Sequence, residues 1–341
     1  MQAGEMEFAT MPQGVSIIIC GYNSSKRISP TLEALQNQQF ANRIILWEVI
    51  LVDNASTDET EQVAREVWNK NPVTNLKIVK EKKPGLMNAR AKGLAYAVYD
   101  VVSFIDDDNW VEPLWVQKMV EIFSLNEKIG ACGGKSEAVF EKNKPDWFDK
   151  YQNAFAVGTQ GEQSGIIDDK KGFLWGAGLS FRNSIWQDLQ RRGFKNLTLG
   201  REGENINAGE DTELCYVIRL LGYHLYYRED LVLKHFMPDN RMNIDYLAKM
   251  CEGFGKSSAR LNSYRVLLDK DNFTIRPWWY EWLATKRKII FLNLQVIFTS
   301  NIQKKIGIIV NTAYNKGYAK QVRVDKKAIH LNIDFLKKIF M

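Results

Sequence analysis

Residues 101–109 read VVSFIDDDN and place three adjacent aspartates directly behind an apolar run. The residues of the run, 101–105, are mostly β-branched or aromatic, which predicts a buried strand. Asp106, Asp107 and Asp108 at the end of such a strand repel one another and lose solvation, so a surface loop has little reason to gather them. A divalent cation offsets both costs, because Mg²⁺ and Mn²⁺ prefer oxygen ligands and often bridge to phosphates. The stretch therefore predicts a metal–diphosphate site at the carboxyl end of a strand; the alternative is an acidic loop solvated by water.

Strand and helix patterns alternate along the rest of the first third of the chain. Strands are expected at residues 15–20, 47–52 and 76–80, with helices at 29–38, around 63–67 and at 88–98. This alternation predicts right-handed βαβ units and a parallel sheet covered on both faces. Ligands of such sheets bind outside the carboxyl ends of the strands. Asp53, which follows the second strand, and the aspartates at 106–108 should therefore face one crevice.

Composition places the chain among ordinary globular proteins. Its 341 residues suffice for one large or two ordinary domains, with 45% hydrophobic and 25% charged residues. The net charge of +6 is mild and gives no argument for nucleic acid as a partner. The four cysteines are widely spaced without a C-x-x-C pair, which favours reduced thiols in a cytosolic protein over disulfides or a zinc site. Because neither a signal pattern nor a long apolar run occurs, we expect a cytoplasmic protein, with a peripheral position on the inner face of the plasma membrane as the alternative.

Two further acidic positions are candidates for binding and catalysis. Asp53 could accept hydrogen bonds from a base or ribose edge, or it could be a turn residue or helix cap. Glu210 and Asp211 follow a glycine and precede an amphipathic run. They could present a general base at a helix start, or they could be an acidic first turn favoured by the helix dipole.

A histidine and a tryptophan complete the candidates. His235 follows an expected strand at 231–234 and could be a neutral metal ligand beside the aspartates, or a hydrogen-bonded structural residue. Trp175 and Gly176 offer an aromatic plane beside a small residue, which suits a sugar ring. The alternative for Trp175 is a core residue next to a turn.

Five segments, taken in order, resemble those of family 2 glycosyltransferases with the GT-A fold. They are 15–23 (VSIIICGYN), 48–58 (EVILVDNASTD), 84–90 (PGLMNAR), 104–108 (FIDDD) and 209–211 (GED). Each segment alone is weak, whereas five in the right order and spacing are specific. Together they cover roughly residues 13–240 and leave out the last hundred residues.

The resemblance implies an α/β architecture, with a Rossmann-like, mostly parallel central sheet flanked by helices. It implies a glycosyltransferase domain at 13–240, divided into a nucleotide-binding half at 13–110 and an acceptor-binding half at 111–240. A mainly helical C-terminal extension is expected at 241–341. The implied reaction is an inverting transfer from a nucleotide-diphosphate sugar, with a UDP-sugar favoured, to an acceptor hydroxyl. The Gln-x-x-Arg-Trp motif and membrane helices of the processive synthases are absent, so a single-addition enzyme is favoured over a polymerase.

The resemblance also implies roles for individual residues. Asp53 would bind the nucleobase, while Asp106 and Asp108 would hold the ribose and a divalent Mn²⁺ or Mg²⁺ bound to the diphosphate. Asp211 would deprotonate the acceptor hydroxyl, and His235 would reach the metal or diphosphate. The remaining implied contacts are Tyr22, Arg90 and Asp107 to the nucleotide sugar, Glu210 beside the base, and Trp175 and Gly176 to the acceptor.

The competing classes are a sugar-phosphate nucleotidyltransferase and an inactive nucleotide-sugar-binding module. The first should open with a glycine-rich, Arg-containing loop, and a dehydrogenase should show G-x-G-x-x-G after the first strand; residues 20–25 (CGYNSS) fit neither. The retained aspartates argue against the inactive module.

The expected partners follow from the implied reaction and from the C-terminal residues. The acceptor would be a glycan or a lipid-linked sugar in cell-surface polysaccharide or glycolipid assembly. At 278–292, tryptophans precede basic residues, which suits an anionic membrane surface. The alternative is packing of these helices on the core or on a second subunit in a homodimer.

Overall fold

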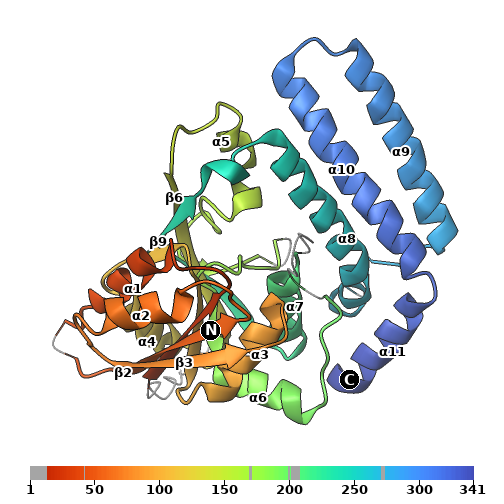
Figure 1. The fold of residues 1–341 in the computed structure, drawn as a ribbon. Helices are drawn as coiled ribbons and strands as arrows, with labels where there is room; N and C mark the ends of the chain where they lie inside the picture. Colours follow the sequence, from red (N-terminus) through yellow and green to blue (C-terminus); the bar gives the residue numbers. More distant parts are fainter. Residues whose placement is uncertain (1–13, 42, 169–170, 199, 201–207, 270–272) are drawn as a thin grey trace, which may run out of the picture.

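The computed structural model describes residues 14–341 except 42, 169–170, 199, 201–207 and 270–272. Within these residues, nine strands form one mixed sheet, and helices lie on both of its faces (Figure 1). The strand order is β3-β2-β1-β4-β8-β6-β9-β5, with β7 paired to β9. A mixed α/β fold with C-terminal helices is therefore confirmed.

The first half of the sheet is parallel, as the sequence predicts. It consists of β1 (Gly14–Gly21), β2 (Leu46–Asn54), β3 (Asn75–Glu81) and β4 (Val101–Asp106). The connecting helices are α1 (Ile28–Gln36), α2 (Thr60–Trp68) and α3 (Leu86–Tyr96). Helices α1 and α3 each begin and end one or two residues before the expected bounds.

Alternating side chains of the buried strands explain why both faces are covered. Successive residues of a strand point to opposite faces. Ile17 and Ile19 of β1 share a core cluster with α1, α2 and α4 (Trp115–Leu125). Ile18 instead joins a second cluster with residues of α3, α6 (Asn183–Arg191) and α7 (Glu210–Leu220). Burial on both faces accounts for the uninterrupted apolar run in β1.

The second half of the sheet is mixed, which the sequence did not indicate. Its strands are β5 (Asn109–Val111), β6 (Ile129–Phe140), β7 (Gly165–Ile166), β8 (Ser180–Arg182) and β9 (His224–Met237). Strand β8 runs antiparallel to β4 and β6, β9 runs parallel to β6, and β5 pairs antiparallel with β9. Only two residues separate β4 from β5, which is too short for a parallel crossover, so β5 pairs elsewhere. The strand expected at 231–234 extends from His224 to Met237.

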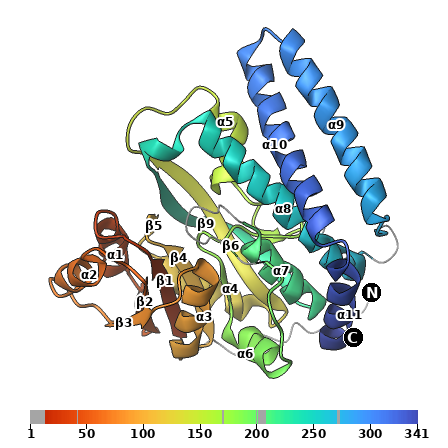
Figure 2. The ribbon, with the colours of Figure 1, turned by 45° about the vertical axis from the view of Figure 1, so that its right-hand side comes forward.

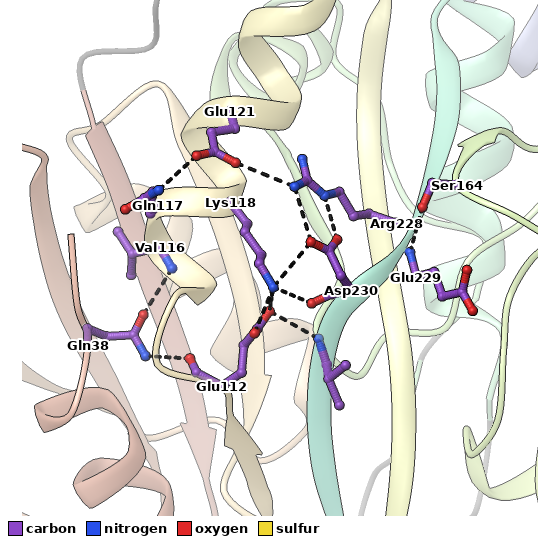
Figure 3. A network of polar contacts seen from close by, with 11 residues as sticks. Gln38, Glu112, Val116, Gln117, Lys118, Glu121, Ser164, Arg228, Glu229 and Asp230 are labelled. Carbon is purple, nitrogen blue, oxygen red and sulfur yellow. Dashed lines mark hydrogen bonds and ion pairs between the residues drawn. The ribbon is translucent and has the colours of Figure 1, made fainter. Parts of the chain in front are cut away.

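A polar network fixes β9 against α4 (Figure 3). The buried Lys118 of α4 contacts both carboxylate oxygens of Glu112 at 2.7 Å and Asp230 Oδ2 at 3.5 Å. Arg228 pairs with Asp230 at 2.6 Å and reaches Glu121 at 3.5 Å. A buried ammonium needs such partners, because an unpaired one would be costly. The network anchors the strand that carries His235.

The C-terminal helices are α8 (Ile244–Leu268), α9 (Trp278–Phe298), α10 (Ile302–Val324) and α11 (Ala328–Phe340). Short helices α5 (Phe148–Tyr151), η1 (Gln152–Phe155) and η2 (Asp239–Arg241) precede them. Leucines and other apolar residues of α8 and α11 join the second core cluster, so these helices complete the core. Helices α9 and α10 form a hairpin, with α10 lying between α8 and α9 (Figures 1 and 2). No helix of the described residues has the length and apolarity needed to cross a membrane.

Two glycines let the backbones of α8 and α10 approach closely. A Cβ atom on Gly255 would lie 2.0 Å from the carbonyl oxygen of Tyr314, and one on Gly317 would lie 2.0 Å from that of Glu252. Real atoms do not come this close, so any side chain at these positions would push the helices apart.

We expect Gly255→Ala to lower the free energy of unfolding by about 2 kcal/mol, because overpacking outweighs the gain in helix propensity. Urea unfolding followed by circular dichroism measures the change. The control is Gly307→Ala in α10, where the new Cβ would meet no atom closer than 3.4 Å. It should leave stability unchanged or raise it by up to about 1 kcal/mol. Equal effects of the two substitutions would contradict the role of Gly255.

Asp58 ties the loop after β1 to the loop after β2. One of its oxygens accepts a hydrogen bond from the backbone N–H of Ser25 at 3.0 Å, and the other accepts from that of Thr60 at 3.1 Å. Burial alone would raise the pKa of Asp58, but hydrogen bonds from Thr60 and Ser25 to the carboxylate lower it to about 2. The ionised side chain therefore stabilises the fold.

We expect Asp58→Asn to destabilise the protein at pH 6 and to do so less at lower pH. The native pKa of about 2 lies below the unfolded value of about 3.9, so the contribution is present above about pH 4 and is lost as the pH falls through about 2. At pH 3 the difference from wild type should be about half of its pH 6 value. Urea unfolding at both pH values measures it, with the exposed Asp334→Asn as control, and a pH-independent difference would refute the linkage.

Candidate active site

A cavity of about 1290 Å³ opens at the carboxyl ends of β1 and β4. The start of α3, the start of α7 and one side of α8 also contribute to its walls. Because parallel strands end at the same edge of a sheet, loops after different strands meet there. Ten of the residues singled out in the sequence line it: Tyr22, Arg90, Asp106, Asp107, Asp108, Trp175, Gly176, Glu210, Asp211 and His235.

Asp53 is the exception among the candidates. It lies at the end of β2, where its carboxylate accepts a hydrogen bond from the backbone N–H of Ser56 at 3.2 Å. Its neighbour Asn54 lines the cavity instead and holds the loop before α3, accepting from the N–H of Gly85 at 2.8 Å. Asp53 thus makes the kind of contact expected of a turn residue, which was the alternative to ligand binding. Its contact with a nucleobase stays a prediction.

Asp107 is held by groups from the loop after β1. It accepts hydrogen bonds from the hydroxyl of Ser24 and from Arg27, whose Nη2 lies 2.8 Å away. Burial, and then the neighbouring charge of Asp108, raise the pKa of Asp107, while Arg27 opposes the shift. Arg27 and Ser24 therefore offset only part of the cost of burying this carboxylate.

Asp108 faces a second set of partners on the other side of the turn. It accepts from the side chain of Asn109 at 3.2 Å, pairs with Arg241 Nη1 at 3.2 Å and lies 3.5 Å from Nε2 of His235. The pairing of β5 with β9 sets this geometry, because Asn109 lies directly opposite His235 in the ladder. The other ring nitrogen of His235, Nδ1, is buried and has no hydrogen-bond partner among the described residues.

The acidic cluster does not form a complete metal cage. No group of three or more His, Cys, Asp or Glu side chains in the described part of the chain is arranged to hold a metal ion. Magnesium usually binds through one or two carboxylates and takes its other ligands from water and substrate phosphates. The pair of Asp108 and His235 fits an ion of that kind, which would arrive with a diphosphate.

Asp211 and Arg90 meet around Gly176. The two carboxylate oxygens of Asp211 accept hydrogen bonds from the N–H groups of Gly176 and Thr212, each at 2.8 Å. The guanidinium of Arg90 lies 4.6 Å from the ring centre of Phe104. A Cβ atom on Gly176 would be 3.0 Å from Arg90 and 3.4 Å from Asp211. Gly176 therefore leaves room for a cation and a carboxylate on one wall of the cavity.

Three other candidates differ in exposure. Tyr22 follows β1 and is 52% exposed, whereas Trp175 is 8% exposed. The ammonium of Lys171 lies 5.3 Å from the ring centre of Trp175, so this ring is largely covered. Glu210 is the first residue of α7 and is buried against the cavity. The contacts of Trp175 and Gly176 with the acceptor stay predictions. So does the role of Glu210 beside the general base.

Sequence reasoning missed the cations that surround the cavity. Arg27, Lys171 and Arg241 all line it, and burial lowers the pKa of Lys171 to about 8. The sequence offered one signal for two of them: Arg27 lies shortly after the first expected strand, and Arg241 follows His235 by six residues. This spacing does not reveal which carboxylate each arginine contacts.

Comparisons with known proteins identify the family of the chain. Residues 16–189, just over half of the chain, match the sequence model of Glycosyl transferase family 2. The glucosyl-dolichyl phosphate glucuronosyltransferase of Haloferax volcanii is 22% identical over 247 residues, which are 71% of this chain and 76% of that protein. The chondroitin synthase of Escherichia coli is 28% identical over 170 residues, 48% of this chain, and this match spans only 24% of the synthase.

Solved structures share the fold at low sequence identity. The mannosyltransferase PcManGT from Pyrobaculum calidifontis, in complex with GDP-Man and Mn²⁺, is 16% identical with a TM-score of 0.56, covering 95% of this chain and 90% of that one. TarS 1-349 of S. aureus, in complex with UDP-GlcNAc, is 14% identical with a TM-score of 0.50, covering 93% and 92%. The fold is GT-A, and the chain belongs to glycosyltransferase family 2.

Proposed function

We propose that this glycosyltransferase moves a sugar from a nucleotide-diphosphate sugar, with inversion, to an acceptor hydroxyl, and that a divalent metal assists. One observation carries the proposal: a single cavity is lined both by the acidic cluster after β4 and by Asp211 at the start of α7. A UDP-sugar is the favoured donor. The GDP-Man and UDP-GlcNAc complexes of the structural neighbours support a nucleotide-diphosphate sugar as the donor.

Asp106, Asp108 and His235 form the leaving-group end of the proposed site. Asp108 and His235 would hold Mn²⁺ or Mg²⁺, which as a Lewis acid stabilises the charge of the departing diphosphate, and Asp106 in the same cavity would contact the ribose. Arg241 already lies against Asp108, and Arg27 against Asp107. Both guanidinium groups line the cavity. Arg241 would turn to a phosphate when the metal binds Asp108, whereas Arg27 would stay with Asp107.

Asp211 is the proposed general base. A hydroxyl is a poor nucleophile near pH 7, and a carboxylate in contact with it can accept its proton as the bond to the sugar forms. Each oxygen of Asp211 accepts one hydrogen bond from a backbone N–H, and a carboxylate has room for about four in all. A base on the face opposite the leaving group gives inversion.

The remaining predicted contacts complete the proposal. Tyr22, Asp53, Arg90 and Asp107 would bind the nucleotide sugar, and Trp175 and Gly176 would contact the acceptor beside Glu210. We propose a single sugar addition in cell-surface polysaccharide or glycolipid assembly. The acceptor would be a glycan or a lipid-linked sugar; the similar Haloferax volcanii protein is a glucosyl-dolichyl phosphate glucuronosyltransferase.

The reaction class is tested by its products. The full chain is incubated with Mn²⁺, a glycan or lipid-linked acceptor and a panel of nucleotide sugars, which are chosen first by thermal shift, since a bound ligand raises the stability of the folded state. Transfer predicts release of nucleoside diphosphate without pyrophosphate. Release of pyrophosphate from a nucleoside triphosphate and a sugar phosphate would support a nucleotidyltransferase and overturn the proposal.

We expect Asp211→Asn to reduce kcat by about 10² to 10⁴, because the amide cannot take the acceptor proton. Donor affinity, measured by calorimetry with Mn²⁺ present, should stay within about twofold of wild type, since Asp211 belongs to the acceptor end in this proposal. The matched control is Asp149→Asn, an exposed carboxylate that should leave both quantities unchanged. Wild-type turnover in Asp211→Asn would rule out this base.

We expect Asp108→Ala to remove the Mn²⁺ dependence of donor binding. Loss of a direct ligand should weaken UDP binding at least about tenfold when Mn²⁺ is present, and little when it is chelated. The comparison variant Arg241→Ala breaks the same ion pair but keeps the carboxylate, so it should retain the Mn²⁺ effect. If both variants respond to Mn²⁺ as the wild type does, Asp108 does not bind the metal.

A further inference from the structure

The outer face of α9 is apolar and faces away from the protein. Both views show α9 as the outermost helix, separated from α8 by α10 (Figures 1 and 2). Its buried stripe of Thr285, Ile289 and Leu292 accounts for its packing in the hairpin. Exposed apolar residues on the other side include Trp279, Leu283, Ile290, Leu294, Ile297 and Phe298.

These exposed residues share one side of the helix. Residues 283, 290, 294 and 297 recur at the spacing that stacks side chains along a helix face. They are exposed by between 43% and 70%, and Phe298 at the end of the helix by 85%. Apolar side chains gathered on one helix face in this way mark a binding site rather than an ordinary scatter of surface residues.

Charge is distributed unevenly along the chain. Residues 274–341 hold 13 Lys and Arg against 3 Asp and Glu, a net charge of +10. Since the whole chain carries +6, residues 1–273 carry a net −4. On a helical projection the exposed Lys286 and Lys288 flank the apolar face of α9, and Arg287 lies within it. Three exposed basic side chains therefore border or interrupt the apolar face of α9.

We propose that α9 docks on an anionic lipid surface, lying parallel to the membrane with its outer face in the boundary between headgroups and acyl chains. An interfacial helix buries an apolar face and places Lys and Arg near anionic headgroups. The aromatic residues at its start match the amphipathic rings that settle at headgroup level. This inference does not rest on the proposed reaction.

A second copy of the chain fits this face less well. Pairing through α9 would bring two regions of +10 together, and like charges across an interface oppose association. A soluble polyanion would match the charge but leave the apolar side chains in water. An anionic bilayer satisfies both features.

The test is co-sedimentation of the full chain with vesicles at 0.1 M salt. We expect binding to phosphatidylcholine vesicles that contain 30% phosphatidylglycerol, and at least tenfold weaker binding to pure phosphatidylcholine. Neutralising Lys286, Arg287 and Lys288 to Gln should weaken binding by about a hundredfold, because each basic residue near an anionic surface contributes roughly fivefold. The control neutralises the exposed Lys70, Lys128 and Lys195 to Gln and should change binding by less than about threefold.

A second pair of variants tests the apolar face. Leu294→Asp with Phe298→Asp should weaken vesicle binding by at least about a hundredfold, whereas Ile44→Asp with Leu125→Asp, at exposed sites elsewhere, should not. Thermal unfolding verifies that each variant folds, and the Gln variant tests the surface independently. Equal binding to both vesicle types, or wild-type binding by the Leu294/Phe298 variant, would overturn the proposal. The proposal would also be overturned if light scattering found the wild type to be a dimer and the Leu294/Phe298 variant a monomer, and if neither protein bound vesicles.

Discussion

The site is organised around the electrostatic cost of three adjacent carboxylates at the end of a buried strand. Asp107 and Asp108 are 7% and 4% exposed, so water alone does not compensate them. The compensating groups come from distant parts of the chain: Ser24 and Arg27 from the loop after β1, and Arg241 from the segment between β9 and α8. These contacts therefore join the loop after β1 to the segment that leads into the C-terminal helices.

A second buried carboxylate couples the proposed base to the C-terminal helices. Glu213 lies one turn along α7 from Glu210 and is fully buried. It accepts hydrogen bonds from the backbone N–H of Thr198 at 3.0 Å and from the hydroxyl of Tyr264 in α8 at 2.5 Å. These contacts fix the rotation of α7, and with it the direction of Asp211. Helix α8 thus acts as part of the site, although no family motif extends that far along the chain.

The sequence predicts those features that depend on local patterns. Strands β1, β2 and β4 are buried on both faces and appear as runs rich in apolar and β-branched residues, and the carboxyl end of β4 locates Asp106 and Asp108. The mixed half of the sheet depends on pairings between residues far apart, such as Asn109 with His235, which no local pattern encodes. Arg27 and Arg241 were missed for the same reason, because an arginine's spacing along the chain does not identify its partner. Asp53 shows the converse limit, since a carboxylate after a strand can serve the turn as well as a ligand.

The same ion pairs suggest why the protein itself supplies so few metal ligands. Under the proposed function, a cation arriving alone would compete with Arg241 for Asp108 and leave a guanidinium without an anion near the cavity. A cation arriving with a diphosphate brings that anion, so the carboxylate can turn to the metal while Arg241 turns to a phosphate. Charge is then balanced before and after binding. A complete cage of protein carboxylates would lose this exchange, because it would hold the metal whether or not a donor were present.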